Sequence, residues 1–297
     1  MLHKTILNGI GNTPMVKLSR ISDNVYVKLE SRNPGGSIKD RAALYMIRDA
    51  EARGLLKKGG TIVEPTSGNT GIAIAMIASV LGYRTVIVMP DSMSKERAEI
   101  MKAYGAEVIF TPGSKGMDGA VKKAESVAKE RGGMILGQFN NQSNVMAHYV
   151  GTGREILEDV PDVAFIVAGI GTGGTVTGIG KAMRNFSPNT KVIGVEPAES
   201  PLITSGKAGA HKIQGIGANF IPGIFDQSVV DSVVTVTGDD AIAMTRRLAD
   251  EEGIFAGISS GAAVHAAVQM AKKNKGKKVV AILADSGERY MSTGIFS

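Results

Sequence analysis

The chain has 297 residues, of which 43% are hydrophobic and 21% charged, an ordinary composition for a globular enzyme of one large or two medium domains. Its net charge of +6 comes from basic residues spread along the sequence, and tryptophan is absent, so we do not expect nucleic-acid binding. Cysteine is absent, the four histidines are scattered and no apolar run is long enough to cross a membrane, which excludes disulfides and predicts no metal site, no membrane segment and a cytoplasmic location.

Short β-branched segments alternate with helical segments along nearly the whole chain. In chain order, we expect strands at 26–30, 61–64, 85–89, 107–110, 164–168, 191–195 and 278–283, and helices from 42 onward and at 70–81, 94–104, 117–131, 142–157 and 176–186. This alternation predicts an α/β fold with two doubly wound, mostly parallel sheets and helices on both faces. We expect residues 40–145 to form a smaller, mobile domain and residues 1–39 with 146–297 a larger one. Ligands of such sheets bind beyond the carboxyl ends of the strands.

The first motif centres on Lys39, which follows a strand and a turn and lies at the start of a helical segment. The positive end of the helix dipole disfavours an ammonium group there, so Lys39 should lose its proton more easily than a surface lysine. A neutral amine is what imine chemistry requires. Ser37 and Asp40 have the spacing of a capping box that would hold this turn. Taken alone, a solvated lysine near a helix cap is the simpler interpretation.

The second motif, Glu64–Gly71, connects a strand to a helix through small hydroxyl residues and glycines. Backbone N–H groups in such a loop, together with the dipole of the following helix, favour an anion the size of a carboxylate. Asn69 adds a side-chain amide that can hold a ring oxygen or a substrate group. A capped helix start with a tight turn is the alternative that involves no ligand.

The third motif is the glycine-rich turn Gly169–Thr175, again between a strand and a helix. Glycines let the backbone approach a phosphate closely, and threonine hydroxyls can donate to it. The turn also contains the pattern G-x-G-x-x-G, and Glu196 ends the next strand, where a ribose-binding acid is expected. An NAD-dependent dehydrogenase is therefore an alternative, although a dinucleotide fingerprint usually opens the first βαβ unit and this one lies past mid-chain.

Two further segments follow strands or precede helices near the end of the chain. The small-residue turn Gly257–Ala263 offers a neutral hydroxyl to a heteroaromatic nitrogen. The segment Asp285–Tyr290 follows the last strand and can close the other side of a ligand. Neither segment would point to a ligand without the other three motifs.

Together, from Ile10–Met15 to Gly287–Thr293, these motifs resemble the cysteine synthase (O-acetylserine sulfhydrylase) family of fold-type II pyridoxal-phosphate enzymes, whose fold is like that of tryptophan synthase β. The resemblance implies pyridoxal 5′-phosphate as cofactor, and Lys39 as the catalytic lysine that forms a Schiff base with it and moves the α-proton of the substrate. The cofactor-binding residues it implies are Asn69, Gly171, Thr172, Gly173, Gly174, Thr175 and Ser259, with Ser260 a less favoured candidate for the ring nitrogen. The substrate-binding residues are Thr66, Ser67, Gly68, Thr70 and Gln138, to which we add Asn219.

The neutral hydroxyl at the ring nitrogen predicts a weaker electron sink than an aspartate would produce. Such a sink suits β-elimination from an activated serine to an aminoacrylate, followed by addition of a thiol. With O-acetyl-L-serine and sulfide, the product of this β-replacement is L-cysteine. The chain departs from the family at Asn219, where glycine is usual, at Arg154, where proline is common, and at Ala284–Asp285, where proline-serine is more usual. A cysteine-consuming enzyme that releases hydrogen sulfide, similar to cysteine lyase or to cystathionine or lanthionine synthase, is the alternative within the same chemistry.

The resemblance also implies partners. We expect small-molecule amino-acid substrates, a homodimer, and docking of the carboxyl-terminal tail of serine acetyltransferase in the active-site cleft. Binding of the substrate carboxylate is expected to draw the two domains together and to exclude water from the reaction.

Overall fold

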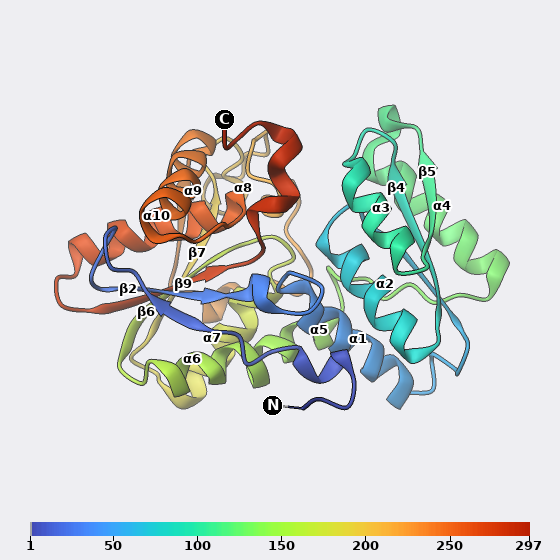
Figure 1. The fold of residues 1–297 in the computed structure, drawn as a ribbon, viewed down its shortest axis with the longest axis horizontal. Helices are drawn as coiled ribbons and strands as arrows, with labels where there is room; N and C mark the ends of the chain where they lie inside the picture. Colours follow the sequence, from blue (N-terminus) through green and yellow to red (C-terminus); the bar gives the residue numbers. More distant parts are fainter. Residues whose placement is uncertain (1) are drawn as a thin grey trace.

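The computed structural model describes residues 2–297 and contains two sheets flanked by helices (Figure 1). The larger sheet has the strand order β1-β2-β9-β6-β7-β8, and only β1 runs antiparallel to its neighbour. The smaller sheet has the order β3-β4-β5 and is parallel throughout. The strands are β1 (Met15–Lys17), β2 (Val25–Leu29), β3 (Thr61–Pro65), β4 (Arg84–Pro90), β5 (Glu107–Thr111), β6 (Val163–Gly169), β7 (Lys191–Pro197), β8 (Ser232–Val236) and β9 (Lys278–Leu283). The predicted α/β class with two mostly parallel sheets is confirmed.

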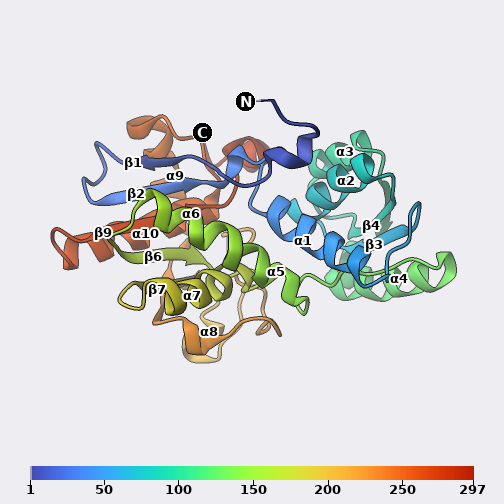
Figure 2. The ribbon, with the colours of Figure 1, turned by 90° about the horizontal axis from the view of Figure 1, so that it is seen from below.

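Helices cover both faces of the larger sheet. Buried residues of α9 and α10 pack on one face, and those of α6 and α7 pack on the other (Figures 1 and 2). The helices are α1 (Lys39–Ala52), α2 (Asn69–Leu81), α3 (Lys95–Ala103), α4 (Gly116–Arg131), α5 (Gln142–Ala147), α6 (Gly153–Asp159), α7 (Gly174–Phe186), α8 (Leu202–Ser205), α9 (Gly238–Glu252) and α10 (Ile258–Lys273). Within residues 2–297 we find no helix that combines the length and the apolar character needed to span a bilayer.

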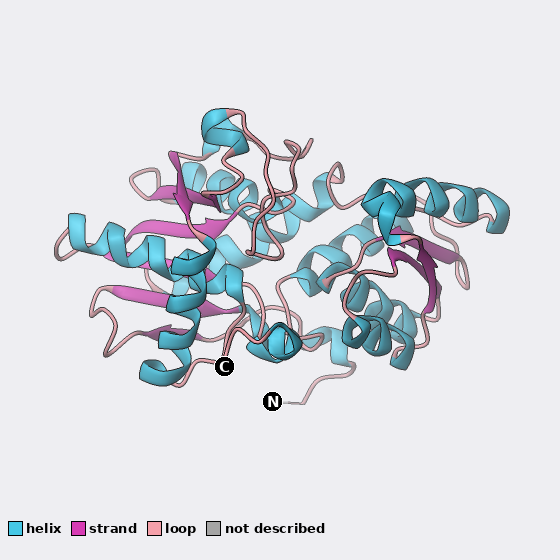
Figure 3. Cartoon of the chain, turned by 90° about the horizontal axis from the view of Figure 1, so that it is seen from above, coloured by secondary structure: helices cyan, strands magenta, loops and turns pink. Residues whose placement is uncertain are grey.

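The smaller sheet has its own buried clusters, formed with α1, α2, α3 and α4. Leu7, from the short 3-10 helix Ile6–Gly9, packs among the buried residues of α1 and α2. In Figure 3 the two groups of strands stand apart, with helices and connecting loops between them. The carboxyl ends of β3, β6 and β9 lead into these connections. Ligands of parallel sheets bind at the carboxyl ends of the strands, so a ligand site is expected here.

The structure differs from the expected elements in two respects. The helix expected at 142–157 is broken into α5, a π-helical turn at His148–Thr152 and α6. A π-helical turn interrupts regular helix geometry and often lies at a functional site, and here it brings His148 next to Thr175. The strands β1 and β8 and the helices α8 and α9 were not predicted. The two strands lie at the edges of the larger sheet, where the apolar pattern that identifies a buried strand is weak.

Candidate active site

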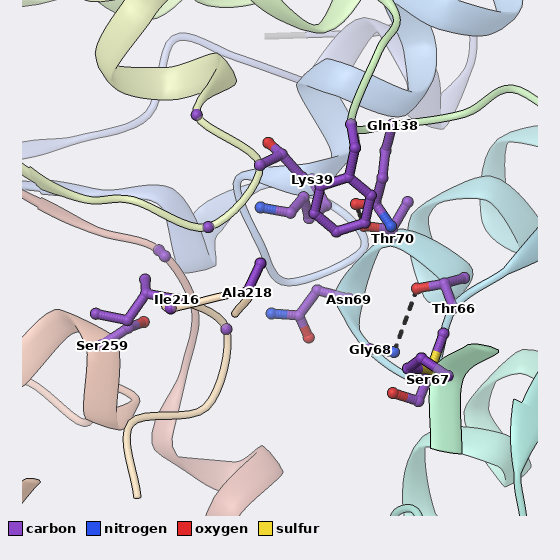
Figure 4. A pocket seen from close by; sticks show the side chains of 18 of the residues that line it. Lys39, Thr66, Ser67, Gly68, Asn69, Thr70, Gln138, Ile216, Ala218 and Ser259 are labelled. Atoms are coloured by element: carbon purple, nitrogen blue, oxygen red, sulfur yellow. Dashed lines mark hydrogen bonds between the residues drawn. The ribbon is translucent and has the colours of Figure 1, made fainter. Parts of the chain in front are cut away.

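A cavity of about 670 Å³ lies between the two sheets, at the carboxyl ends of β3, β6 and β9. Most of the predicted site residues line it, namely Lys39, Thr66, Ser67, Gly68, Asn69, Thr70, Gln138, Gly171, Thr172, Gly173, Thr175 and Ser259. In Figure 4, Asn69 lies between Ser259 on one side and the loop at Thr66–Gly68 on the other. Segments that are far apart in the sequence therefore converge on one chamber.

Lys39 is the first residue of α1 and its side chain forms part of the cavity wall. The surrounding protein poorly replaces hydration of an ammonium group, so burial lowers the pKa of Lys39, and the nearby carboxylate of Asp285 opposes this in part. The direction agrees with the sequence-based expectation, but burial is the largest cause rather than the helix dipole. A lysine in this setting reaches the neutral form more readily than a solvated one.

The capping box predicted at this turn is wrong. The hydroxyl of Ser37 accepts a hydrogen bond from Lys39 N at 3.3 Å, whereas Asp40 reaches back to Gly35 N at 2.5 Å instead of binding the backbone of Ser37. The turn is held by the segment directly after β9, because Ile38 N donates to Ala284 O at 2.9 Å. Tertiary contact rather than a local cap positions the start of α1.

The loop that precedes α2 forms the side of the cavity on the smaller sheet (Figure 4). The first N–H groups of α2 have no partner within the helix and can bind an anion. Thr70 Oγ1 donates to Gln138 Oε1 at 2.6 Å, and Gln138 is fixed further because Asn144 Nδ2 donates to its carbonyl at 2.9 Å. With its oxygen occupied, the amide of Gln138 has its NH2 group available as a donor. This arrangement suits a carboxylate.

We expect Gln138→Glu to raise KM for the amino-acid substrate by at least about tenfold while changing kcat less, because two carboxylates would then face each other at a cost above about 1.4 kcal/mol. Steady-state kinetics would measure the effect. Gln142→Glu is the matched control, since Gln142 is exposed at the start of α5. An equal rise in KM in both variants would contradict the assignment of Gln138.

Glu64 holds the backbone of the cavity wall that carries Gln138. It is 1% exposed at the end of β3, and its carboxylate accepts hydrogen bonds from the backbone N–H groups of Leu136, Gly137 and Gln138 at 3.0, 3.2 and 3.3 Å. Burial outweighs these donors and raises the pKa of Glu64 to about 7.

The folded protein thus binds the Glu64 proton more tightly than the unfolded chain does. This stabilisation is complete below the unfolded pKa of 4.5 and is lost as the pH rises to about 7, at a cost of about 3 kcal/mol. We expect Glu64→Gln to remove that loss, as measured by denaturant unfolding at pH 5 and pH 8. Asp40, whose pKa is also raised to about 7 by burial, titrates in both proteins. Glu158→Gln, at an exposed carboxylate, is the control, and an unchanged pH dependence in Glu64→Gln would refute the prediction.

The glycine-rich turn between β6 and α7 has no room for side chains at its glycine positions. A Cβ atom at Gly171 would lie 2.3 Å from the carbonyl oxygen of Gly215. Gly173 has a φ of 81°, in the left-handed region, and a Cβ atom there would lie 2.8 Å from Phe225 Cβ. α7 begins at Gly174, directly after this turn, and the first N–H groups of a helix have no partner within the helix, as a phosphate site requires. Gly174 does not line the cavity, because it packs against Asn144, where a Cβ would lie 2.2 Å from Oδ1.

His148 and Asn144 were not predicted as site residues and do not line the cavity, but both contact threonines of the glycine-rich turn that does. His148 Nε2 lies 3.3 Å from Thr175 Oγ1, and Asn144 Nδ2 donates to Thr172 Oγ1 at 3.1 Å. Burial lowers the pKa of His148 well below its usual range, with the positive charges of Arg41 and Lys39 as smaller causes. The imidazole is therefore neutral, and it orients the hydroxyl of Thr175 without adding charge to the glycine-rich turn, which we call the glycine cradle. No local pattern predicts these two contacts, since the fold alone brings α5 and the π-helical turn that follows it against α7.

Ser259, the second residue of α10, lines the cavity on the larger-sheet side. Ser260 is buried outside the cavity, and its hydroxyl has no hydrogen-bond partner among residues 2–297. Asn219 does not line the cavity, although its neighbours Ala218 and Phe220 do. Its backbone has a φ of 58°, and its Oδ1 accepts a hydrogen bond from Ser200 Oγ at 2.9 Å.

Glu196 is occupied elsewhere. Its buried carboxylate accepts hydrogen bonds from Ile203 N at 2.8 Å and Thr204 N at 3.0 Å, and so caps the short helix α8. It is not among the residues that line the cavity. The acid that a dinucleotide site needs for its ribose is therefore unavailable, and the dehydrogenase interpretation is wrong.

Comparison with known proteins agrees with this geometry. Residues 6–285 match the family model described as pyridoxal-phosphate dependent enzyme. The chain is 50% identical over 295 residues to the cysteine synthase of Staphylococcus aureus (strain N315), a match that covers 97% of this chain and 95% of that protein. The crystal structure of O-ureido-L-serine synthase is 46% identical in sequence, has a TM-score of 0.97, and is matched over 100% of this chain and 96% of that one. The crystal structure of a hydrogen sulfide-producing enzyme from Fusobacterium nucleatum is also 46% identical, has a TM-score of 0.93, and is matched over 97% of this chain and 100% of that one. The chain belongs to the pyridoxal-phosphate dependent enzymes and, within them, to the cysteine synthase family.

Proposed function

We propose that this chain catalyses a β-replacement that forms L-cysteine from O-acetyl-L-serine and sulfide. The observation that carries the proposal is the convergence of Lys39, the loop before α2 and the glycine cradle on one cavity. The half-identical cysteine synthase of Staphylococcus aureus supports this choice of reaction. Bound pyridoxal phosphate supplies an electron-withdrawing ring that makes the α-proton of an amino acid acidic and lets its β-substituent leave.

The residues present fit that cofactor. The cradle at Gly171–Thr175 admits a phosphate because only hydrogen atoms occupy the Cβ positions of its glycines, and the N–H groups of α7 bind it. Ser259 offers the ring nitrogen a neutral hydroxyl, and Asn69 offers the ring oxygen an amide. The opposite wall, from Thr66 to Thr70 with Gln138, holds the substrate carboxylate. The cavity thereby orients the α-proton toward Lys39.

Lys39 has two tasks in this proposal. It holds the cofactor through Nζ when no substrate is present, and its neutral amine removes the α-proton and later returns a proton to the same carbon. Both tasks require the amine without its proton, which the lowered pKa of Lys39 favours. The acetate leaves from the β-carbon and sulfide takes its place.

A product assay tests this reaction directly. Purified protein with excess pyridoxal phosphate is given O-acetylserine with sulfide in one assay and cysteine alone in another. We expect cysteine formation to exceed sulfide release from cysteine. Faster sulfide release would replace the synthesis proposal with the cysteine-consuming alternative, which the similarity to the hydrogen sulfide-producing enzyme of Fusobacterium nucleatum supports. Serine and homocysteine, supplied in further assays, distinguish a cystathionine synthase-like activity.

We also propose that residues 40–145 move as a unit against residues 1–39 and 146–297 when substrate binds. The main hydrophobic clusters of the two sheets are separate, and Leu7 is the residue of 1–39 that is buried with α1 and α2. The polar contacts between the two parts include the hydrogen bond from Arg97 Nη2 to Gln214 Oε1 at 3.2 Å and the ion pairs of Arg41 with Glu30 and Glu155, about which the two parts would turn. Closure would exclude water from the reaction. Small-angle scattering and limited proteolysis with and without substrate would test the motion, and identical profiles would refute it.

Three further properties belong to the same proposal. We infer a homodimer, a cytoplasmic location, which the cysteine-free sequence supports, and a cleft that accepts the tail of serine acetyltransferase. Phe220, half exposed at the cavity wall beside Phe139, offers an apolar contact for such a tail. Light scattering, cell fractionation and competition of a tail peptide with O-acetylserine test these statements in turn. A peptide that fails to compete would remove docking in the cleft.

A further inference from the structure

Asn69 is held at both ends of its side-chain amide by residues from the other side of the cleft. Its Nδ2 donates to Asp285 Oδ2 at 2.6 Å, and its Oδ1 accepts from Arg289 Nη1. The same oxygen of Asp285 accepts a second hydrogen bond, from the hydroxyl of Tyr290 at 2.8 Å. Arg289 is itself anchored, because its Nη2 donates to the carbonyl of Gly35. These contacts join the start of α2 to the segment that follows β9.

The partners determine which way the amide faces. A carboxylate can only accept a hydrogen bond and a guanidinium group can only donate one, so the amide of Asn69 cannot be reversed without two repulsive contacts. The carbonyl oxygen of Asn69 is occupied by Arg289, and one of its two N–H bonds by Asp285. The second N–H bond is the group that Asn69 can still offer to the cavity it lines.

We propose that Asp285 and Arg289 are positioning residues that fix the amide of Asn69 as a hydrogen-bond donor to the cofactor, and that the site thereby selects the ionised form of the ring oxygen. An ionised oxygen accepts such a bond fully, and a charge-assisted hydrogen bond is about twice as strong as a neutral one. The inference rests on the proposed function of the same cavity. It assigns to Asp285, where the family more often has serine, a defined task.

Charge and positioning must be separated in the test. Lys39, Arg97, Asp285 and Tyr290 line the same cavity as Asn69, Arg289 donates to its amide, and Asp40 lies near Arg289. Removing the charge of Asp285 alone would favour an ionised ring oxygen, whereas losing the position of Asn69 would disfavour it. Asp285→Asn and Asp285→Ala remove the same charge, but only asparagine keeps an oxygen that can accept from Asn69 and Tyr290. The NH2 group of that asparagine can take the place of Asp285 Oδ1, which has no hydrogen-bond partner in the described part of the chain.

The experiment measures the visible absorbance of the bound cofactor against pH in both variants. The midpoint of the absorbance change reports the pH at which the ring oxygen is half ionised. We expect the pH midpoint of Asp285→Ala to lie about one unit above that of Asp285→Asn, a tenfold difference in proton affinity. In proteins that also carry Asn69→Ala, the two midpoints should coincide, because Asp285 acts through Asn69. Equal midpoints with Asn69 present, or a difference that persists without it, would overturn the proposal.

A second variant covers the case in which Asp285→Ala fails to fold. Arg289→Met removes both a positive charge and the donor to Asn69 Oδ1 at a half-buried position. Its midpoint should rise above that of the wild type, and by clearly more than the same substitution raises it in Asn69→Ala, where only the loss of charge acts. An unchanged midpoint would contradict the inference. The wild-type spectrum separates the two proposals: protein without a visible cofactor band refutes the proposed function and this inference with it, whereas a normal band with failed variants refutes the inference alone.

Discussion

Lys39→Ala is expected to lower kcat/KM for β-replacement by about 10⁴, the upper part of the range for loss of a general acid–base group. Lys39 is the lysine of the cavity wall whose proton affinity is reduced by burial, and alanine can neither hold the cofactor through nitrogen nor move the α-proton. A coupled assay of cysteine formation measures the rate. The visible absorbance of the wild-type protein with cofactor should change in the variant, because the bond through Nζ is lost.

Lys95→Ala provides the matched control. Lys95 is also the first residue of a helix, α3, but its side chain is exposed. It therefore shares the local sequence position of Lys39 without the burial or the cavity. Retention of more than about one tenth of wild-type activity by Lys39→Ala would show that another base removes the α-proton, and an equal loss in Lys95→Ala would remove the role of the site altogether.

The second large effect is expected at the phosphate cradle. We predict that Gly171→Ala weakens pyridoxal phosphate binding by at least about 30-fold, equivalent to about 2 kcal/mol for one hydrogen bond to a charged group. The new methyl group would lie 2.3 Å from the carbonyl oxygen of Gly215, so one of the two backbone segments must move and the N–H groups lose their aim at the phosphate. Equilibrium dialysis of the cofactor against the apo protein measures the dissociation constant.

The control at Gly9 separates cradle geometry from a general effect of glycine replacement. A Cβ at Gly9 would meet Pro34 Cγ at 3.5 Å, an ordinary contact, and its φ is not in the left-handed region. Gly9→Ala should bind the cofactor as the wild type does. Wild-type affinity in Gly171→Ala would show that the phosphate does not rest on this turn.

Much of the architecture follows from local sequence patterns. Alternating apolar strands and helices predicted the two parallel sheets, because a strand buried on both faces needs a continuous β-branched run wherever it lies in the chain. Glycines and hydroxyl residues between strand and helix predicted the loops at Thr66–Thr70 and Gly171–Thr175, since a close backbone approach restricts residue type locally. Those loops line the cavity as expected.

Other features depend on contacts between distant segments. Asp285 meets Asn69 across 216 residues, and no pattern near either residue predicts that pairing. The neutral state of His148 results from its burial between α5 and α7, and Asn219 binds Ser200 rather than lining the cavity, despite its place in a cavity loop. The sequence by itself determined the class of fold and the chemistry of each loop, because these depend on residue type and period. Only the tertiary structure decided proton affinity and side-chain direction, since both depend on which distant groups remove water and supply partners.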